Sequence, residues 1–127
     1  MSLHLEYDPK PDGRPDPGEI VWTWVPYEDD PQQGKDRPVL LVARTDDDDL
    51  VALMLTSKDH DRDQADEERH GRYWLDIGSG DWDRERRPSE VRLDRLITVD
   101  PDAVRREGAV LGRAVFDEVA AAVARLH

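Results

Sequence analysis

Residues 18–43, GEIVWTWVPYEDDPQQGKDRPVLLVA, form the stretch that decides the fold. β-Branched and aromatic side chains fill residues 19–25, and this composition predicts a strand. Residues 38–43 are a near-continuous apolar run, which predicts a buried central strand. We expect the polar residues between the two runs, 26–37, to form a loop, and loops of about twelve residues are often functional.

Further short strands are predicted downstream of this pair. Apolar or alternating runs indicate strands at residues 50–55, 73–77, 89–94 and 96–99. Asp100 and Pro101 match the N-cap and the first position of a short helix. From about residue 113, apolar residues recur at intervals of three and four along one helical stripe: Phe116, Val119, Val123 and Leu126. Five or six strands followed by a helix indicate a mainly β protein, a small and highly curved β-barrel with a C-terminal helix.

The chain has 127 residues, which fits one domain. Prolines among Asp and Gly mark residues 1–17 as an extended arm, so residues 18–127 are expected to form the folded domain. The absence of Cys excludes a disulfide scaffold, a thiolate metal site and a Cys nucleophile. No apolar run reaches the length of a membrane span and residues 1–10 lack the pattern of a signal peptide, so we expect a cytoplasmic location.

The net charge of −12 opposes nucleic-acid binding by the protein as a whole. The acidic excess lies in two segments, residues 1–30 and 44–70. Any RNA or DNA site therefore needs a local basic groove away from those segments.

Two residues at the ends of neighbouring predicted strands have the chemistry for such a site. Arg37 comes directly before the buried strand at 38–43, and Thr56 follows the strand at 50–55. If these strands pair in antiparallel fashion, both side chains emerge at the same edge of the sheet. A guanidinium and a hydroxyl at one edge can hold a phosphate group.

Other candidate side chains are weaker. Trp82 stands in a polar loop with Arg84 and two further arginines, a grouping that can stack on bases and neutralise a nucleic acid strand, although a solvated loop is the better explanation. His60 follows the strand at 50–55 and is a candidate titrating group or an ordinary surface residue. The aspartates at 59–63 start like a calcium loop, but the required Gly and Glu are absent, so no metal site is predicted.

Three segments together resemble the MazF/PemK family of type II toxin–antitoxin toxins. These are the opening stretch with its Gly34-Lys35-Asp36-Arg37-Pro38 element, the run LMLTS at residues 53–57, and SEVRLDRLITVD at residues 89–100. The resemblance implies an SH3-like barrel, a homodimer, a cognate antitoxin protein and no cofactor. It also implies metal-independent, sequence-selective cleavage of single-stranded RNA, which leaves 2′,3′-cyclic phosphate and 5′-hydroxyl ends.

The resemblance places the family's catalytic residues on Arg37 and Thr56. A guanidinium stays protonated near neutrality and is a poor base, so we expect Arg37 to stabilise the dianionic phosphorane and Thr56 to donate a hydrogen bond to a phosphate oxygen. Ser57 can substitute for Thr56 or assist it. Gln33, Gly34 and Lys35 would shape the loop over the substrate.

Two other classes of function stay open at this stage. A catalytically degenerate barrel could act as a protein-binding module, and an acidic barrel without any groove could be structural. An open groove at Arg37 and Thr56 favours the enzyme, whereas a groove blocked by residues 1–17 or 58–70 favours binding.

Overall fold

The structure is a computed structural model that describes residues 5–10, 14–27, 30–57, 74–104 and 106–126. Its centre is an antiparallel pair formed by the first two predicted strands, β1 (Glu19–Pro26) and β2 (Gly34–Arg44), in which Thr23 faces Arg37. The remaining elements follow in chain order: β3 (Leu50–Ser57), β4 (Trp74–Gly78), β5 (Ser89–Arg92), β6 (Ile97–Val99), η1 (Pro101–Ala103), β7 (Arg106–Val110) and α2 (Arg113–Leu126).

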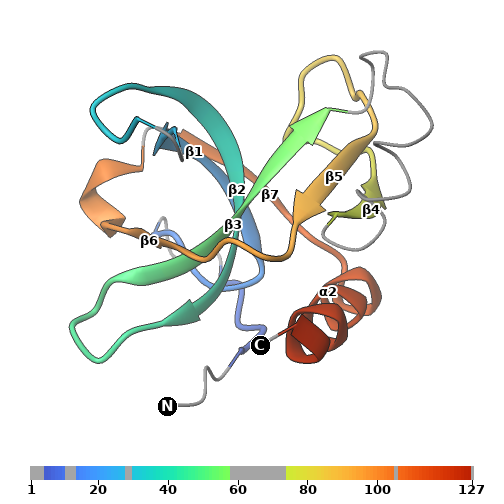
Figure 1. Cartoon of the computed structure of the whole chain (residues 1–127). Coiled ribbons are helices and arrows are strands. Elements are labelled where there is room, and N and C mark those ends of the chain that lie inside the picture. Colours follow the sequence, from blue (N-terminus) through green and yellow to red (C-terminus); the bar gives the residue numbers. More distant parts are fainter. Residues whose placement is uncertain (1–4, 11–13, 28–29, 58–73, 105, 127) are drawn as a thin grey trace.

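The described strands form one curled antiparallel sheet in the order β4-β5-β3-β2-β1-β7, and β6 pairs with β3 (Figure 1). β3 changes partners along its length. Its first half pairs with β2 and β6, while its last residues pair with β5, where Thr56 lies opposite Glu90. Because β3 belongs to both parts of the sheet, the sheet curls into a half-barrel, as the mainly β barrel prediction requires.

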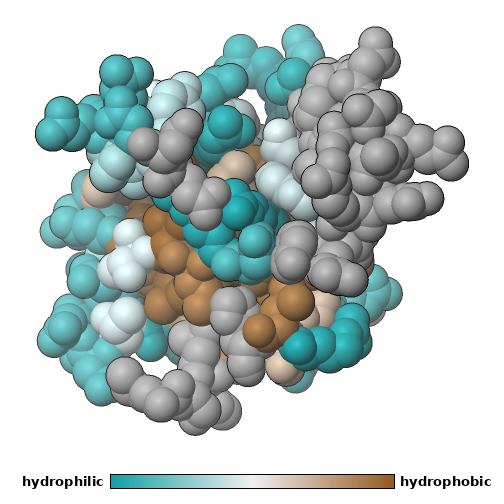
Figure 2. All heavy atoms as spheres, in the orientation of Figure 1, coloured by the Kyte–Doolittle hydropathy of each residue, from teal (hydrophilic) through white to brown (hydrophobic). Residues whose placement is uncertain are grey.

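Apolar side chains pack on both faces of this sheet. One cluster joins the sheet to α2 and includes Ile20, Leu53 and Leu55 with Phe116 and Val123 of the helix. A second cluster includes Val21, Val25, Val39, Leu41 and Val99. Each fully buried aliphatic side chain contributes about 1.5–3 kcal/mol to folding, which offsets the high charge of the surface. On the face of the molecule shown in Figure 2, hydrophobic residues gather near the centre and hydrophilic residues surround them.

The structure differs from the sequence expectations in two strands. β2 begins at Gly34 rather than at residue 38, so Arg37 is a strand residue and not the last residue of a loop. The polar residues before Pro38 enter the strand because their backbone groups pair with β1 while the side chains of Lys35 and Asp36 remain exposed. β7 was not predicted, since its sequence REGAV has no apolar alternation; it exists because it pairs with the free edge of β1.

Residues 5–10 of the N-terminal arm lie along the folded domain. The amide of Glu6 donates to the carbonyl of Val42 over 2.9 Å, and the Tyr7 hydroxyl donates to the Leu111 carbonyl over 2.6 Å. The Tyr7 ring also packs against Phe116, with 5.1 Å between the ring centroids. The arm thereby connects β2 to the start of α2.

Within the described ranges, no helix has both the length and the apolar character that a membrane crossing requires.

Candidate functional site

A hollow of about 240 Å³ lies where β1, β2 and the end of β3 meet the loop of residues 79–88. We call it the Arg37 hollow. The described residues that line it are Trp22, Lys35, Asp36, Arg37, Pro38, Leu55, Thr56, Trp82, Asp83, Arg87 and Ser89.

Arg37 and Thr56 meet in this hollow because of the register between β2 and β3. Val39 pairs with Met54, and continuing that antiparallel register by two residues on each strand aligns Arg37 with Thr56. Both are half-buried, so the barrel holds their backbones while the side chains stay accessible. The sequence expectation that the two side chains emerge together is therefore met by the geometry.

The described lining of the Arg37 hollow is locally positive on a strongly acidic protein. Among the described residues, three cationic side chains line it, Lys35, Arg37 and Arg87, against the two carboxylates of Asp36 and Asp83. Within the described part of the chain, the Arg37 side chain forms no hydrogen bond or ion pair. A cation that a strand holds and that no described residue neutralises is suited to bind an anion.

The loop of residues 79–88 forms one wall of the hollow through hydrogen bonds of two indoles. Trp22 Nε1 donates to the Trp82 carbonyl over 2.9 Å, and Trp82 Nε1 donates to Ser89 Oγ over 3.1 Å. Trp82 is only 6% exposed and belongs to the apolar cluster under α2. It lines the hollow from within the core, so it offers no open ring face on which a base could stack.

The Arg87 guanidinium is fixed to this wall by Asp83. Arg87 Nε donates to Asp83 Oδ2 over 2.9 Å, and the amide of Glu85 donates to Asp83 Oδ1 over 3.0 Å. Burial raises the pKa of the Asp83 carboxyl, but the hydrogen bond and charge of Arg87 and the backbone donors outweigh burial, so the net pKa lies below its usual value of 3.8. Asp83 is therefore ionised throughout the neutral range and keeps Arg87 oriented.

The other predicted site residues lie elsewhere. Arg84 is exposed and does not line the Arg37 hollow, whereas Arg87 of the same loop does. Gln33 and Gly34 lie at the start of β2, where Gly34 fits beneath the Trp24 ring, and neither lines the hollow. The side chain of Ser57 and the whole of His60 lie outside the described residues.

Seven of the described lining residues were not predicted as site residues: Trp22, Asp36, Pro38, Leu55, Asp83, Arg87 and Ser89. A signal for one of them was present in the sequence. Arg87 precedes a proline and then a strand, and Arg37 occupies the same position before Pro38. The sequence gives no comparable signal for Asp83, because its role depends on the fold of the loop.

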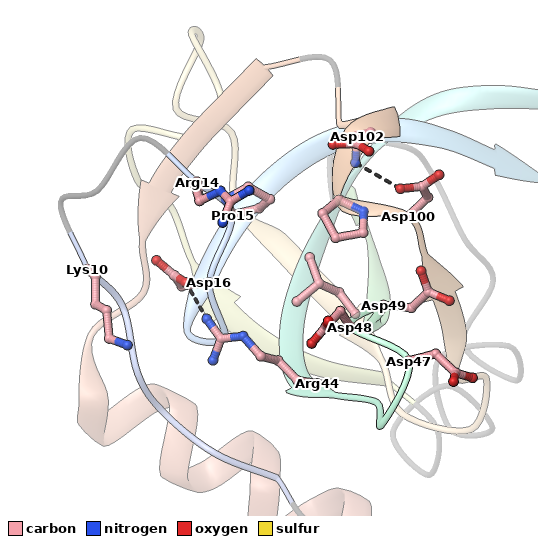
Figure 3. Close-up of a pocket in the computed structure, with 12 residues that line it drawn as sticks. Lys10, Arg14, Pro15, Asp16, Arg44, Asp47, Asp48, Asp49, Asp100 and Asp102 are labelled. Atoms are coloured by element: carbon pink, nitrogen blue, oxygen red, sulfur yellow. Dashed lines mark hydrogen bonds and ion pairs between the residues drawn. The ribbon is translucent and has the colours of Figure 1, made fainter.

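A larger hollow, about 780 Å³, is lined by the arm, the β2–β3 turn and the start of η1 (Figure 3). Aspartates dominate its wall: Asp16, Asp47, Asp48, Asp49, Asp100 and Asp102. Arg44 crosses it to pair with Asp16, and it also pairs with Glu6 and Asp8 of the arm. Phosphate groups are repelled by this wall, and among the described residues no cluster of His, Asp or Glu has the arrangement of a metal site.

Together, the half-barrel, the C-terminal helix and the Arg37 hollow define a small, mainly β protein with a hollow between strands that is lined by basic side chains. The sequence matches the family described as PemK-like, MazF-like toxin of type II toxin-antitoxin system over residues 16–127. The chain belongs to this family.

Two solved structures show the same fold at low sequence identity. One is an endoribonuclease in complex with its cognate antitoxin from a mycobacterial species, 18% identical, with a TM-score of 0.61 over 88% of this chain and 93% of that one. The other is the Mycobacterium tuberculosis toxin MazF-mt6, 17% identical, with a TM-score of 0.53 over 85% of this chain and 94% of that one. No curated protein sequence matches the chain.

Proposed function

We propose that this toxin-family protein is a metal-independent endoribonuclease that cleaves single-stranded RNA at the Arg37 hollow. The observation that carries the proposal is the meeting of Arg37 and Thr56 in one positive hollow. The structurally similar endoribonuclease and the family match support the same class of activity.

The chemistry needs the RNA, the side chains of the hollow and solvent water. The 2′-hydroxyl oxygen attacks the adjacent phosphorus and releases its proton to water, the bond to the 5′-oxygen breaks, and that oxygen takes up a proton from water. The products are a 2′,3′-cyclic phosphate and a 5′-hydroxyl. Arg37 stabilises the two negative charges of the phosphorane, and Thr56 donates a hydrogen bond to a non-bridging oxygen, so the site favours the transition state over the singly charged substrate.

The described part of the arm supports an enzyme over a blocked binding module. Residues 14–16 and Lys10 line the acidic hollow, and no described arm residue lines the Arg37 hollow. Access for an RNA strand is thus not closed by that part of the arm. Residues 58–70, the other segment named in the sequence expectation, lie outside the described residues.

The proposal includes an antitoxin partner and a homodimer in the cytoplasm. Exposed apolar side chains support association with another protein surface. Trp24 is 44% exposed and Tyr27 is 38% exposed at one end of the hairpin, while Val110 of β7 is 56% exposed. Association that buries such side chains is favourable.

The test is RNA cleavage by the purified, antitoxin-free protein in EDTA, with Arg37→Ala beside it and the product ends identified. Arg84→Ala is the matched control, because it removes the same charge outside the hollow. Cleavage that leaves cyclic phosphate ends and is lost only in Arg37→Ala supports the proposal. Absence of cleavage by folded wild-type protein on varied RNAs at low salt refutes it and favours the protein-binding module.

A further inference from the structure

We propose that Arg87 is a second phosphate-binding guanidinium, which binds the backbone phosphate next to the cleaved one, and that Asp83 positions it. This inference rests on the proposed function, because it assigns a further contact of the same RNA site. No side chain of the loop that carries Arg87 was needed to explain cleavage itself.

The first support is that Arg87 lines the same hollow as the cleavage residues but comes from a different segment. Arg37 and Thr56 come from the β2–β3 side, whereas Arg87 comes from the loop of residues 79–88 and lines the same 240 Å³ hollow. Its side chain is 41% exposed. An RNA strand that reaches Arg37 therefore passes within reach of Arg87.

The second support is that the fold holds this guanidinium in place. Asp83, whose side chain is only 10% exposed, accepts the 2.9 Å bond from Arg87 Nε. Asp83 is itself fixed by the amide of Glu85, and the neighbouring Trp82 is anchored to Ser89. A long side chain held in this way loses little conformational entropy when it binds, which is what distinguishes a built site from an ordinary surface arginine.

The third support concerns the charge that Arg87 is suited to bind. Asp83 and Glu85 lie beside the guanidinium, at 2.9 and 3.5 Å from Nε. These carboxylates reduce the positive potential around Arg87, whereas Arg37 carries no such partner among the described residues. A singly charged phosphodiester therefore fits Arg87, and the doubly charged phosphorane fits Arg37. The expected signature is a contribution of Arg87 to KM and not to kcat.

The experiment measures binding separately from cleavage. The probe is a mixed-sequence 12-nucleotide single-stranded RNA that carries 2′-O-methyl groups throughout, so that the nucleophile is blocked. Arg87→Gln is compared with Arg84→Gln, which makes the same charge change at an exposed position of the same loop. We expect Arg87→Gln to raise Kd about tenfold and to lower the slope of log Kd against log salt by about 0.7, whereas Arg84→Gln changes Kd less than about twofold.

Asp83→Asn gives the sharper test of positioning. Removing a carboxylate near the site strengthens RNA binding if only net charge matters. If Asp83 positions Arg87, the same change weakens binding about threefold and raises KM with kcat and the salt slope retained. Arg87→Lys, which keeps the charge without the planar guanidinium, should retain the salt slope and recover only part of the affinity.

Two outcomes overturn the inference. Equal Kd and salt slope for Arg87→Gln and Arg84→Gln refute the phosphate contact, and tighter RNA binding by Asp83→Asn refutes the positioning role. If either occurs while wild-type protein cleaves RNA and Arg37→Ala does not, the proposed function stands and only this inference fails. Absence of RNA binding and cleavage by the wild-type protein refutes both. Thermal unfolding of every variant confirms that the folded proteins are compared.

Discussion

Gly80→Ala is expected to destabilise the wall of the Arg37 hollow. A Cβ on Gly80 would lie 2.8 Å from Cε3 and 2.9 Å from Cη2 of the Trp82 ring, and closer still to Cζ3. Real Cβ atoms essentially never approach other heavy atoms below 3.0 Å, so the ring has to move. Trp82 has little room to do so, because it is only 6% exposed and donates to Ser89.

The magnitude follows from these contacts. Overpacking of a well-filled core costs about 1–3 kcal/mol, and loss of the bond between Trp82 and Ser89 adds about 1 kcal/mol. For a domain of this size, 1 kcal/mol corresponds to roughly 4 °C in Tm, so we expect a decrease of about 8–16 °C. RNA affinity should fall as well, since the loop that carries Arg87 begins at the same place.

The assay is thermal unfolding followed by circular dichroism, with Gly112→Ala as the matched control. A Cβ at Gly112 meets no atom within 4 Å, so that variant lacks the clash. Because the Gly112 carbonyl accepts from Phe116 N at the start of α2, where Ala is less favourable than Gly, it should lower stability by no more than about 1 kcal/mol. A Tm of Gly80→Ala within 2 °C or so of the control would refute the reasoning, because it would show that the Trp82 ring moves at little cost.

Three further predictions concern the site and the arm. Thr56→Val should lower kcat for RNA cleavage about 100-fold because the donor to the phosphate oxygen is lost, while Thr98→Val, at the exposed position of β6, leaves it unchanged. Equal kcat values in a cleavage assay would contradict this role. The Asp83–Arg87 pair should hold RNA affinity constant from about pH 5 to 8. The folded pKa of Asp83 lies below its usual value of 3.8, so the stability contributed by the pair is complete above pH 3.8 and is lost only as pH falls through the folded pKa. A step in RNA affinity near neutrality would therefore come from another group or refute the pairing. Tyr7→Phe should reduce the free energy of unfolding by about 1 kcal/mol in a urea titration, through loss of the bond to the Leu111 carbonyl, and leave cleavage intact; a loss of cleavage at equal stability would place the arm in the function.

The sequence predicted what depends on local composition. The apolar runs located β1 and β3, the helical stripe located the start of α2, and the hairpin argument brought Arg37 to Thr56. These features follow from residues close together in the chain.

What the sequence missed depends on contacts between distant residues. β7 is a strand because it pairs with the free edge of β1, and its own residues lack the apolar alternation that predicts a strand. Arg84 and Arg87 stand in the same arginine-rich loop. The proline after Arg87 is a sequence signal, but only the fold of the loop around Asp83 turns Arg87 toward the hollow and leaves Arg84 exposed. Trp82 looked like part of a solvated loop, and its burial results from a partner on β5.

The exchange of partners along β3 has a consequence for how the protein opens. β3 is hydrogen-bonded to β2 and β6 in its first half and to β5 at its end. Neither half of the sheet can therefore separate without disrupting β3, to which the other half is also paired. Amide protons of β3 should therefore exchange with solvent only through global unfolding. Adaptation to different ligands is then left to side chains and loops, while the backbone that carries Thr56 behaves as a rigid reference.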